Sequence, residues 1–305
     1  MAIRSFLTTL GLAAVLTSMV ALSARADDAR KAGPIGSPEG KERMQLHWVP
    51  VSVKGEPTSS LILMRLCRPN TDEPVGVAVV NHGSPPKASD RPTMKPSSCT
   101  SGVARYFLER QMIAAFPLRR GYGETGGAWA ENYRTCSRAN YGAAGLATAA
   151  DIESTVSYLR GLPFVRGDRI MVVGQSAGGW GTIAYASLNP DNIIGFINVA
   201  GGRGGHNNGE PNSNCRPDEL IAAAGVYGQT ARRPMLWLYT ENDSFFSPRI
   251  SRAMHAAFVK SGGQAVYRLL PAWEKDGHNL FFGNDSSKIW GPIFDEYIKS
   301  VMPPG

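Results

Sequence analysis

The chain has 305 residues, of which 43% are hydrophobic and 19% are charged. This composition excludes a disordered or fibrous chain and fits one large α/β domain or two small ones. The formal charge of +7 is modest, and basic pairs such as Arg119-Arg120 and Arg232-Arg233 are scattered along the sequence. We therefore expect no nucleic-acid-binding groove.

The first 26 residues have the features of an export signal peptide. Arg4 supplies a positive start, Phe6–Leu22 is mostly apolar, and Ala24-Arg25-Ala26 has the small-x-small pattern of a cleavage site. We expect cleavage after Ala26, a periplasmic or secreted protein, and no stable membrane insertion of the mature chain. The alternative is an N-terminal membrane anchor, for which this apolar stretch is short.

Residues 27–45 are polar and rich in Gly and Pro, which predicts a flexible lead-in to a folded domain at 46–305. Two strands come first in that domain, and strands and helices then alternate. The expected strands are Leu46–Val53, Leu61–Leu66, Val77–Val80, Met112–Pro117, Ile170–Val173, Ile193–Val199, Met235–Tyr239 and Ala265–Leu270. The expected helices are Val103–Gln111, Ala143–Leu159, Trp180–Leu188, Ser247–Lys260 and Ser287–Val301.

This alternation predicts an α/β fold with a mostly parallel sheet, an antiparallel N-terminal edge, and helices on both faces. Ligands of such sheets bind beyond the carboxyl ends of the strands. Residues 201–228 depart from the pattern, because they combine a glycine-rich start with a polar stretch. We expect a loop-rich insertion there, which either leans over the site or is a plain surface excursion.

A nucleophile is indicated by Gly174-Gln175-Ser176-Ala177-Gly178, which lies between an apolar strand and an alanine-rich helix. The G-x-S-x-G spacing is that of a nucleophile elbow, a sharp turn that lifts a serine clear of the sheet edge. The turn holds the serine in a strained backbone conformation, and small residues at both glycine positions let the strand and helix approach closely. The pattern therefore predicts Ser176 as a nucleophile.

A serine hydroxyl needs a nearby base and a carboxylate that orients the base. On this type of fold the order along the chain is serine, acid, histidine. Three histidines follow Ser176, and His278 is favoured over His206 and His255 because it lies in the loop after the last strand, where it can swing over the elbow.

The favoured acid is Asp243, which follows the buried-strand pattern at 235–239. Glu241 is the alternative, since it stands closer to the strand, and either carboxylate can instead cap the next helix. Asp276 is near His278 in sequence, but a loop neighbour seldom has the geometry to brace the far nitrogen of the ring.

Acyl transfer also needs two preorganised N–H donors for the oxyanion. One is expected from the backbone of Ala177, and the other from Ser84 in the loop after the strand at 77–80. In the same loop Gly83 permits a close approach. His82 precedes the serine in the chain, so we expect it to hold this loop by hydrogen bonds rather than to act as the base.

Three aromatic side chains near the elbow are candidate pocket residues: Tyr122, Trp129 and Trp180. Ordinary packing beside the sheet is the alternative for all three. Arg120 and Glu124, in the same glycine-rich loop as Tyr122, either contact a polar substrate or form a solvated pair.

Taken together, these motifs resemble the α/β-hydrolase superfamily, and within it the dienelactone hydrolase and acyl-peptidase-like branch. The residues that carry the resemblance are His82-Gly83, Arg120-Gly121-Tyr122-Gly123, Gly174–Gly179, Asp243 and Gly277-His278, and the match runs from about Leu46 to Val301. The resemblance implies a triad of Ser176, Asp243 and His278, with Ala177 and Ser84 forming the oxyanion hole. True dienelactone hydrolases have a cysteine at the elbow, so serine argues against that particular activity.

The four cysteines, Cys67, Cys99, Cys136 and Cys215, have no C-x-x-C spacing, which argues against a zinc or redox motif. Export makes disulfides possible. From the expected topology, Cys136 and Cys215 both belong to the catalytic edge of the sheet and are the favoured pair. Cys67 is expected at the opposite edge, which leaves Cys99 without an obvious partner.

The sequence thus predicts an exported serine hydrolase that cleaves a small-molecule carboxylic ester through an acyl-enzyme, with no metal or organic cofactor. The alternatives are a peptidase or amidase of the same fold, and a non-catalytic binding protein on this scaffold. The acyl group, the alcohol and the oligomeric state do not follow from the sequence.

Overall fold

A computed structural model describes residues 30–53, 55, 57 and 60–302. The expected export signal at residues 1–26 lies outside this described part. The described residues from Lys31 onward form one compact unit. Over the residues that are described, no helix has both the length and the apolar character needed to cross a bilayer.

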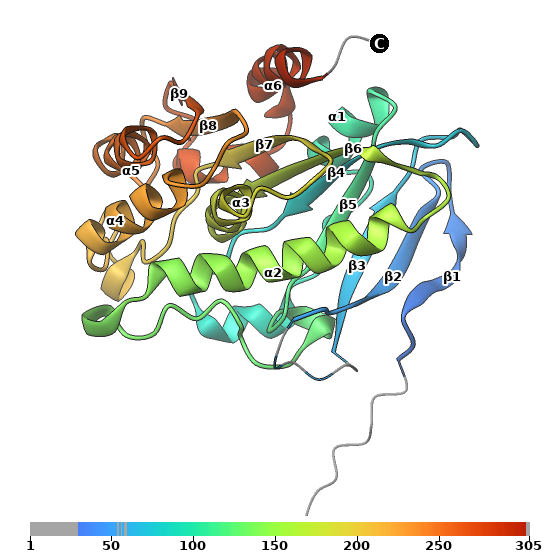
Figure 1. The fold of residues 1–305 in the computed structure, drawn as a ribbon, viewed down its shortest axis with the longest axis horizontal. Coiled ribbons are helices and arrows are strands. Elements are labelled where there is room, and N and C mark those ends of the chain that lie inside the picture. The colour runs from blue at the N-terminus through green and yellow to red at the C-terminus, as the bar shows by residue number, and fades with distance from the viewer. Residues whose placement is uncertain (1–29, 54, 56, 58–59, 303–305) are drawn as a thin grey trace, which may run out of the picture. The chain divides into compact units, whose positions relative to one another are not determined.

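The unit is built on a nine-stranded sheet with the order β1-β2-β3-β5-β4-β6-β7-β8-β9 (Figure 1). The pairs β1–β2, β2–β3 and β3–β5 are antiparallel, and the five remaining pairs are parallel. The predicted parallel sheet with an antiparallel N-terminal edge is therefore confirmed. The strands are β1 (Gly33–Glu39), β2 (Met44–Pro50), β3 (Leu61–Cys67), β4 (Val75–Asn81), β5 (Ile113–Leu118), β6 (Val165–Gln175), β7 (Ile193–Val199), β8 (Met235–Thr240) and β9 (Ala265–Leu270).

The central strands are buried on both faces, as in other parallel sheets covered by helices. Residues 76–81 of β4 and 170–175 of β6 are all buried. The two strands run in the same direction and end together, since Asn81 at the end of β4 pairs with Gly174 near the end of β6. The loops that follow them therefore meet at one edge of the sheet, where the site lies.

The helices fall into two packed groups. In the first, α2 packs against α3 and α4, and α4 packs against α5; in the second, α1 packs against α6. Figure 1 shows α2 and α3 side by side, with α1 and α6 on another side of the sheet. The helices are α1 (Gly102–Glu109), α2 (Tyr141–Arg160), α3 (Ala177–Ser187), α4 (Pro217–Gly228), α5 (Pro248–Lys260) and α6 (Ser287–Val301).

The N-terminal strand β1 was not predicted. The flexible lead-in expected at 27–45 does not hold for residues 33–39, which pair with β2 in the register Gly33 to Trp48 and Ile35 to Leu46. Six of the seven residues of β1 are exposed. Backbone hydrogen bonds to β2, rather than the burial of an apolar face, therefore hold this strand in the sheet. Its Gly- and Pro-rich sequence accordingly has no alternation of apolar and polar residues from which a strand could be predicted.

The expected insertion at 201–228 is loop-like only in its first half. Its second half is helix α4, which begins at Pro217, a residue suited to the first turn because it has no N–H to leave unpaired. Leu220, Ala224 and Tyr227 of this helix are buried. The helix was not predicted, because glycines and polar residues dominate the segment before it.

All four cysteines are in disulfides, Cys67 with Cys99 and Cys136 with Cys215. The expectation that Cys99 lacks a partner was wrong. The end of β3 lies beside the segment that leads into α1, and the Cα atoms of Cys67 and Cys99 are 5.4 Å apart.

Candidate active site

Ser176 lies in a sharp turn between the last residue of β6, Gln175, and the first residue of α3, Ala177. Its φ of 54° and ψ of −118° are a strained conformation for a residue with a side chain. The backbone around it is well held: Ser176 N–H donates to the carbonyl of Val199 at 3.0 Å, and its own carbonyl accepts from Trp180 N at 2.9 Å. The sharp strand-to-helix turn that the sequence predicts at Ser176 is present.

The glycines on either side of Ser176 allow the close approach that this turn requires. A Cβ on Gly174 would lie 2.2 Å from the carbonyl oxygen of Gly178, and a Cβ on Gly178 would lie 2.3 Å from the carbonyl oxygen of Asn81. Both clashes would be with backbone atoms, so neither position accepts a side chain without movement of a strand or a helix.

Asp243 and His278 are joined by a buried hydrogen bond. Asp243 follows β8, and His278 lies in the short 3₁₀ helix Gly277–Phe282 after β9. The imidazole Nδ1 lies 3.0 Å and 3.1 Å from the two carboxylate oxygens of Asp243. The same carboxylate accepts the backbone N–H groups of Phe245 and Phe246, both at 2.8 Å. These contacts orient the ring so that Nε2 is left for proton transfer.

The other candidate acids make different contacts. Glu241 is exposed. Asp276 accepts hydrogen bonds from the backbone N–H and the hydroxyl of Ser244 and from the backbone N–H of His278. Asp276 therefore holds the loop that carries His278 rather than bracing its ring.

The other two downstream histidines lie apart from the Asp243 carboxylate. His206 Nε2 lies 2.9 Å from the hydroxyl of Ser244, and its ring stacks on Phe245. His255 Nε2 lies 3.0 Å from the carbonyl oxygen of Ala265 in β9.

Ser176 and His278 are linked through their neighbours. Among the hydrogen bonds of the described residues, none joins the Ser176 hydroxyl to the His278 ring. The side-chain amide of Gln175 donates to the carbonyl of His278 at 2.9 Å, and the ring of Phe245 stacks on that of His278 with centroids 4.2 Å apart. Phe245 and Ser176 line the same pocket. Ser176 and His278 are thus connected through Gln175 and Phe245.

The pocket at Ser176 is small, about 100 Å³. Its walls come from the loops after β4, β5, β7 and β8, all at the carboxyl edge of the sheet. The residues that line it are Ser84, Pro85, Pro86, Trp129, Tyr133, Ser176, Ala177, Gly202, Arg203, Gly204, Gly205, Phe245 and Phe246.

The two residues expected to donate backbone N–H groups to an oxyanion, Ala177 and Ser84, both line this pocket. Ala177 is the first residue of α3, and the N–H groups of the first turn of a helix have no partner within the helix. Ser84 lines the same pocket from the loop after β4. A Cβ on Gly83 would lie 2.4 Å from Gln175 Oε1 and 3.0 Å from Ser176 Cβ, so glycine is what lets this loop approach the nucleophile.

His82 holds that loop by hydrogen bonds, as predicted. The backbone N–H of Arg119 donates to His82 Nε2 at 3.3 Å, so Nε2 is unprotonated and Nδ1 carries the proton that it donates to the carbonyl of Gly83 at 2.7 Å. Burial, together with the positive charge of Arg119, lowers the pKa of His82 to about 3. The ring is therefore neutral at neutral pH.

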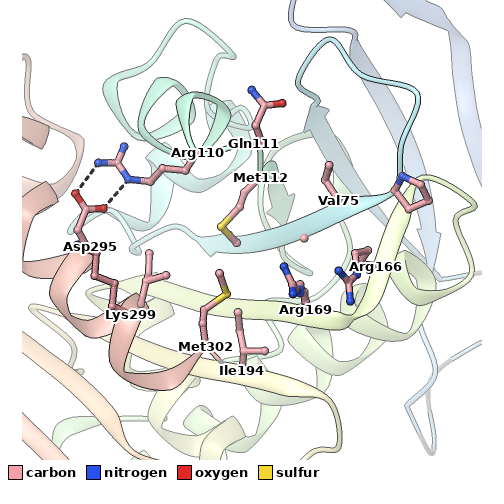
Figure 2. A pocket seen from close by; sticks show the side chains of 13 residues that line it. Val75, Arg110, Gln111, Met112, Arg166, Arg169, Ile194, Asp295, Lys299 and Met302 are labelled. Atoms are coloured by element: carbon pink, nitrogen blue, oxygen red, sulfur yellow. Dashed lines mark hydrogen bonds and ion pairs between the residues drawn. The ribbon is translucent and has the colours of Figure 1, made fainter. Parts of the chain in front are cut away.

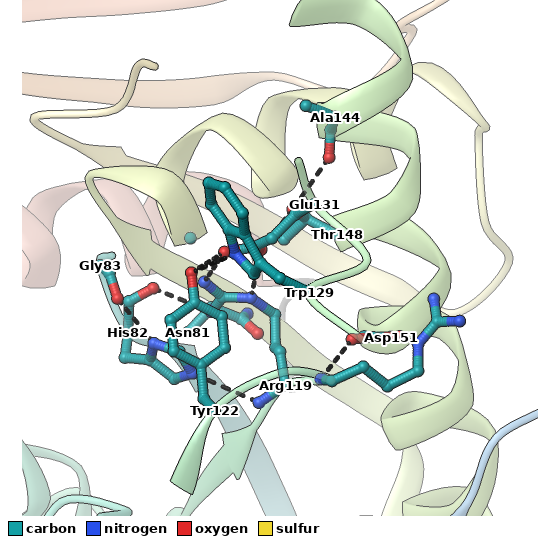
Figure 3. Close-up of polar contacts among 12 residues, drawn as sticks. Asn81, His82, Gly83, Arg119, Tyr122, Trp129, Glu131, Ala144, Thr148 and Asp151 are labelled. Carbon is teal, nitrogen blue, oxygen red and sulfur yellow. Dashed lines mark hydrogen bonds and ion pairs between the residues drawn. The ribbon is translucent and has the colours of Figure 1, made fainter. Parts of the chain in front are cut away.

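A buried ionic cluster beside the pocket was missed by the sequence analysis. The Glu131 carboxylate binds Arg119 at 2.8 Å, and it accepts hydrogen bonds from the hydroxyls of Tyr122 and Thr148 (Figure 3). It also binds Arg203 at 2.9 Å. Burial alone would raise the pKa of Glu131, but the two guanidinium groups hold it well below its ordinary value. Nothing in the local sequence pattern marks Glu131, because it lies in a loop and its partners are distant in sequence.

Only one of the three predicted pocket aromatics lines the pocket. Trp129 does so, and its indole N–H donates to the hydroxyl of Tyr122 at 3.0 Å. The expectation was wrong for Tyr122 and Trp180, which are both fully buried. Tyr122 is turned inward by Glu131, and the indole N–H of Trp180 donates to the carbonyl of Tyr141 in the interior.

Arg120 is a buried residue rather than a solvated one. Its guanidinium is buried against Asp151 of α2, with Nε 2.6 Å from the carboxylate, and its backbone N–H donates to the same group (Figure 3). Burial raises the pKa of Asp151 to about 6 despite this partner. Arg120 therefore anchors the loop after β5 to α2.

The disulfide between Cys136 and Cys215 joins two segments that reach the pocket. This is the pair that the sequence analysis favoured. Cys136 follows the loop that carries Trp129 and Tyr133, and Cys215 N–H donates to the carbonyl of Gly204, a pocket residue, at 2.8 Å. The bond therefore ties opposite walls of the pocket together. No group of three or more His, Cys, Asp or Glu side chains is placed to hold a metal ion in the part of the chain that is described.

Comparison with known proteins gives one partial family match. Residues 100–201, about a third of the chain, match the family model described as the prolyl oligopeptidase family. A comparison with curated proteins finds no significant match.

Many solved structures have a similar fold. An acetyl xylan esterase from Paenibacillus sp. R4 is 12% identical with a TM-score of 0.59, covering 89% of this chain and 88% of that one. An acylaminoacyl peptidase from Pyrococcus horikoshii is 14% identical with a TM-score of 0.58, covering 90% and 51%. Porphyromonas gingivalis dipeptidyl peptidase 4 is 13% identical with a TM-score of 0.57, covering 85% and 36%.

This chain thus spans about half or a third of the length of those two peptidases and most of the length of the esterase. The family match at residues 100–201 includes Ser176. The chain therefore has the α/β-hydrolase fold of serine hydrolases, and its structure is similar to the dienelactone hydrolase and acyl-peptidase-like branch of that fold.

Proposed function

We propose that this protein is an exported serine hydrolase that cleaves small carboxylic esters through an acyl-enzyme. The observation that carries the proposal is the strained Ser176 at an elbow, in one assembly with the buried Asp243–His278 pair. A strained residue at a pocket persists only where the surrounding structure maintains it, and such strain gathers at functional sites.

In the proposed reaction His278 Nε2 takes the proton of the Ser176 hydroxyl as its oxygen attacks the ester carbonyl. Asp243 stabilises the imidazolium that forms, and the backbone N–H groups of Ala177 and Ser84 donate to the oxyanion. His278 then gives the proton to the departing alcohol. Water repeats the sequence on the acyl-enzyme, releasing the acid and freeing Ser176. Catalytic hydrogen bonds are often long without substrate, which accounts for the separation of Ser176 from the ring.

The pocket supports a small acyl group. Its volume of about 100 Å³ is below the usual range for sites that enclose drug-sized molecules, and Pro85, Trp129 and Phe246 occupy its walls. The esterase neighbour, which this chain matches over most of its length, agrees with an ester substrate.

The test is covalent labelling with a fluorophosphonate and turnover of p-nitrophenyl acetate. We expect wild type to be labelled and active, and Ser176→Ala to lose both while its circular dichroism spectrum is unchanged. Ser157→Ala, on the exposed surface of α2, is the matched control and should behave as wild type. Labelling that survives Ser176→Ala would refute the assignment of the nucleophile, and absence of labelling in wild type would favour a binding protein on this scaffold.

A peptidase or amidase is the second candidate, because residues 100–201 match the prolyl oligopeptidase family. The same triad cleaves both bond types, so the geometry at Ser176 does not separate them. A matched pair of substrates, an amino acid p-nitrophenyl ester and the corresponding p-nitroanilide, does so. We expect the ester to be preferred by kcat/KM, and a preference for the anilide would reverse the order of the two candidates.

A further inference from the structure

A second cavity lies at the opposite end of the sheet from Ser176. Its volume is about 450 Å³, and it is lined by Val75 at the start of β4, Arg169 in the first half of β6 and Ile194 near the start of β7. Arg169 precedes Ser176 by seven residues on an extended strand, which corresponds to about 23 Å. This cavity is therefore not part of the pocket at the nucleophile, and the proposed hydrolysis makes no use of it.

The middle of the cavity is apolar. Met112 at the start of β5 and Met302 after α6 point toward one another across it, and Ile194 lies below them (Figure 2). Methionine side chains are flexible and polarisable, so a lining of this kind adapts to a flexible apolar chain. The volume is within the range of small-molecule sites.

The rim of the cavity is positively charged. Arg110, Arg166, Arg169 and Lys299 line it, with Asp295 as the single acidic residue. Two of these cations are already paired. Arg110 binds both carboxylate oxygens of Asp295, at 2.6 and 2.7 Å, and stacks on the ring of Tyr106. Arg166 binds Asp168 at 2.7 Å.

Arg169 has a different environment from its neighbours. It is half-buried and makes no hydrogen bond or ion pair with any residue in the described part of the chain. Figure 2 shows its side chain directed into the cavity next to the apolar centre. The acid that its charge affects, Asp168, has its pKa lowered first by the hydrogen bond from Arg166 and less by Arg169. An uncommitted guanidinium at the end of an apolar slot is suited to bind a carboxylate.

We propose that this cavity binds a fatty acid, with the alkyl chain between Met112 and Met302 and the carboxylate on Arg169. The charge and shape of the cavity both support this ligand. The guanidinium of Arg169 beside the apolar middle of the cavity matches a molecule with one anionic head and an apolar tail, and Lys299 adds a second positive charge at the rim. A peptide would need several hydrogen-bond partners, and Arg110 and Asp295 at the rim are already bound to each other.

The test is a titration of the full-length protein with octanoate and dodecanoate, by calorimetry at concentrations below micelle formation. We expect saturable binding at one site, with affinity rising up to about fourfold for each added methylene that is buried. Octanol has a similar tail without the charge, and should bind at least tenfold more weakly than octanoate. Equal binding of octanol would overturn the assignment of the carboxylate to Arg169.

Two variants locate the ligand. Arg169→Gln should weaken dodecanoate at least tenfold, whereas Arg249→Gln, the same charge change on the exposed surface of α5, should leave the affinity unchanged. Ile194→Trp should fill the slot and abolish binding. If Arg169→Gln binds dodecanoate as wild type does, or if no saturable binding occurs, the proposal is wrong. Because Arg169 is half-buried and has no structural partner, its variant should fold even if Ile194→Trp does not.

Discussion

The carboxylate of Glu131 receives two N–H groups of Arg119, Nε at 2.8 Å and Nη2 at 3.2 Å, where neither side chain reaches solvent. Arg119 in turn donates to the carbonyl of His82 at 2.8 Å. The loop that supplies the proposed oxyanion donor Ser84 is thereby connected, through two charged side chains, to the loop that carries Trp129. The geometry of the site thus depends on an ion pair that itself contacts no reacting atom.

Replacing Glu131 by alanine should destabilise the protein strongly. Two arginines, Arg119 and Arg203, would remain buried without their shared anion, and breaking a buried pair in this way costs about 3–5 kcal/mol. The measurement is the free energy of unfolding from urea titration. Asp168→Ala, which removes the exposed partner of Arg166, is the control and should cost less than about 1 kcal/mol. Equal losses in the two variants would mean that the cluster adds nothing beyond a surface pair.

Gly178→Ala should abolish esterase activity. The added methyl group would lie 2.3 Å from the carbonyl oxygen of Asn81, so α3 must move away from β4 and Ser176 must move with it. Gly142→Ala is the control, because a Cβ there lies 3.8 Å from its nearest neighbour, and alanine favours a helix. Both variants are to be assayed for p-nitrophenyl acetate turnover and for thermal unfolding. A fully active Gly178→Ala protein would show that close packing at the elbow is unnecessary.

Asp243→Asn should lower kcat by about 10⁴, since an amide neither stabilises an imidazolium nor keeps the ring in the required tautomer. Glu241→Gln should keep wild-type activity, because Glu241 is exposed and Asp243 holds the ring. Steady-state kinetics on p-nitrophenyl acetate distinguish the two acids. The reverse pattern, with Glu241 essential and Asp243 dispensable, would contradict the arrangement described here.

The features that local sequence patterns predict well are those defined by a few neighbouring residues. The elbow at Ser176 is one, because its glycines, strand and helix fall within about fifteen residues of each other. Asp243 and His278 were also predictable, since each follows a strand of the parallel sheet and such strand ends meet at one edge.

Features that depend on contacts between distant residues were not predictable. Glu131 forms an ion pair with Arg203, which lies 72 positions further along the chain. Tyr122 is turned inward because its hydroxyl donates to the buried Glu131 carboxylate. β1 was not predicted for a different reason. It is held by backbone pairing with β2, and this pairing does not require alternating apolar and polar residues. The partner of Cys99 likewise follows from how β3 and the segment before α1 meet.

Acidification should destabilise the protein through His82. Its pKa is about 3 in the folded protein and about 6.5 when unfolded, so between these values the unfolded chain binds more protons and stability falls as the pH falls. At pH 5 the loss from this residue is about 2 kcal/mol relative to pH 7.5. Asp151, whose pKa is about 6 in the folded protein, acts in the opposite direction. The contribution of His82 is therefore measured as the difference in pH dependence between wild type and His82→Gln, not as the total loss of stability in wild type.

The measurement for His82 is urea unfolding of wild type and His82→Gln at pH 7.5 and pH 5.0. We expect the variant to be less stable at pH 7.5, because it loses the hydrogen bonds to Gly83 and Arg119, but to lose less stability between the two pH values. An equal decrease in the free energy of unfolding between pH 7.5 and pH 5.0 in both proteins would show that protonation of His82 does not cause the loss of stability.

The two disulfides should differ in what they contribute to activity. Cys136–Cys215 closes 79 residues and Cys67–Cys99 closes 32, so chain entropy gives about 4.5 and about 3.7 kcal/mol of stabilisation. Replacing either pair by serine should therefore lower stability by similar amounts.

Only the Cys136→Ser, Cys215→Ser double variant should also lower kcat/KM, by at least about tenfold, because Cys215 holds Gly204 at the pocket while Cys67 lies in β3. The assay is run below the unfolding temperature of both variants, so that the loss of folded protein does not affect the measured kcat/KM. Equal activity in the two double variants would show that the pocket walls keep their positions without the bond, and that its contribution is to stability alone.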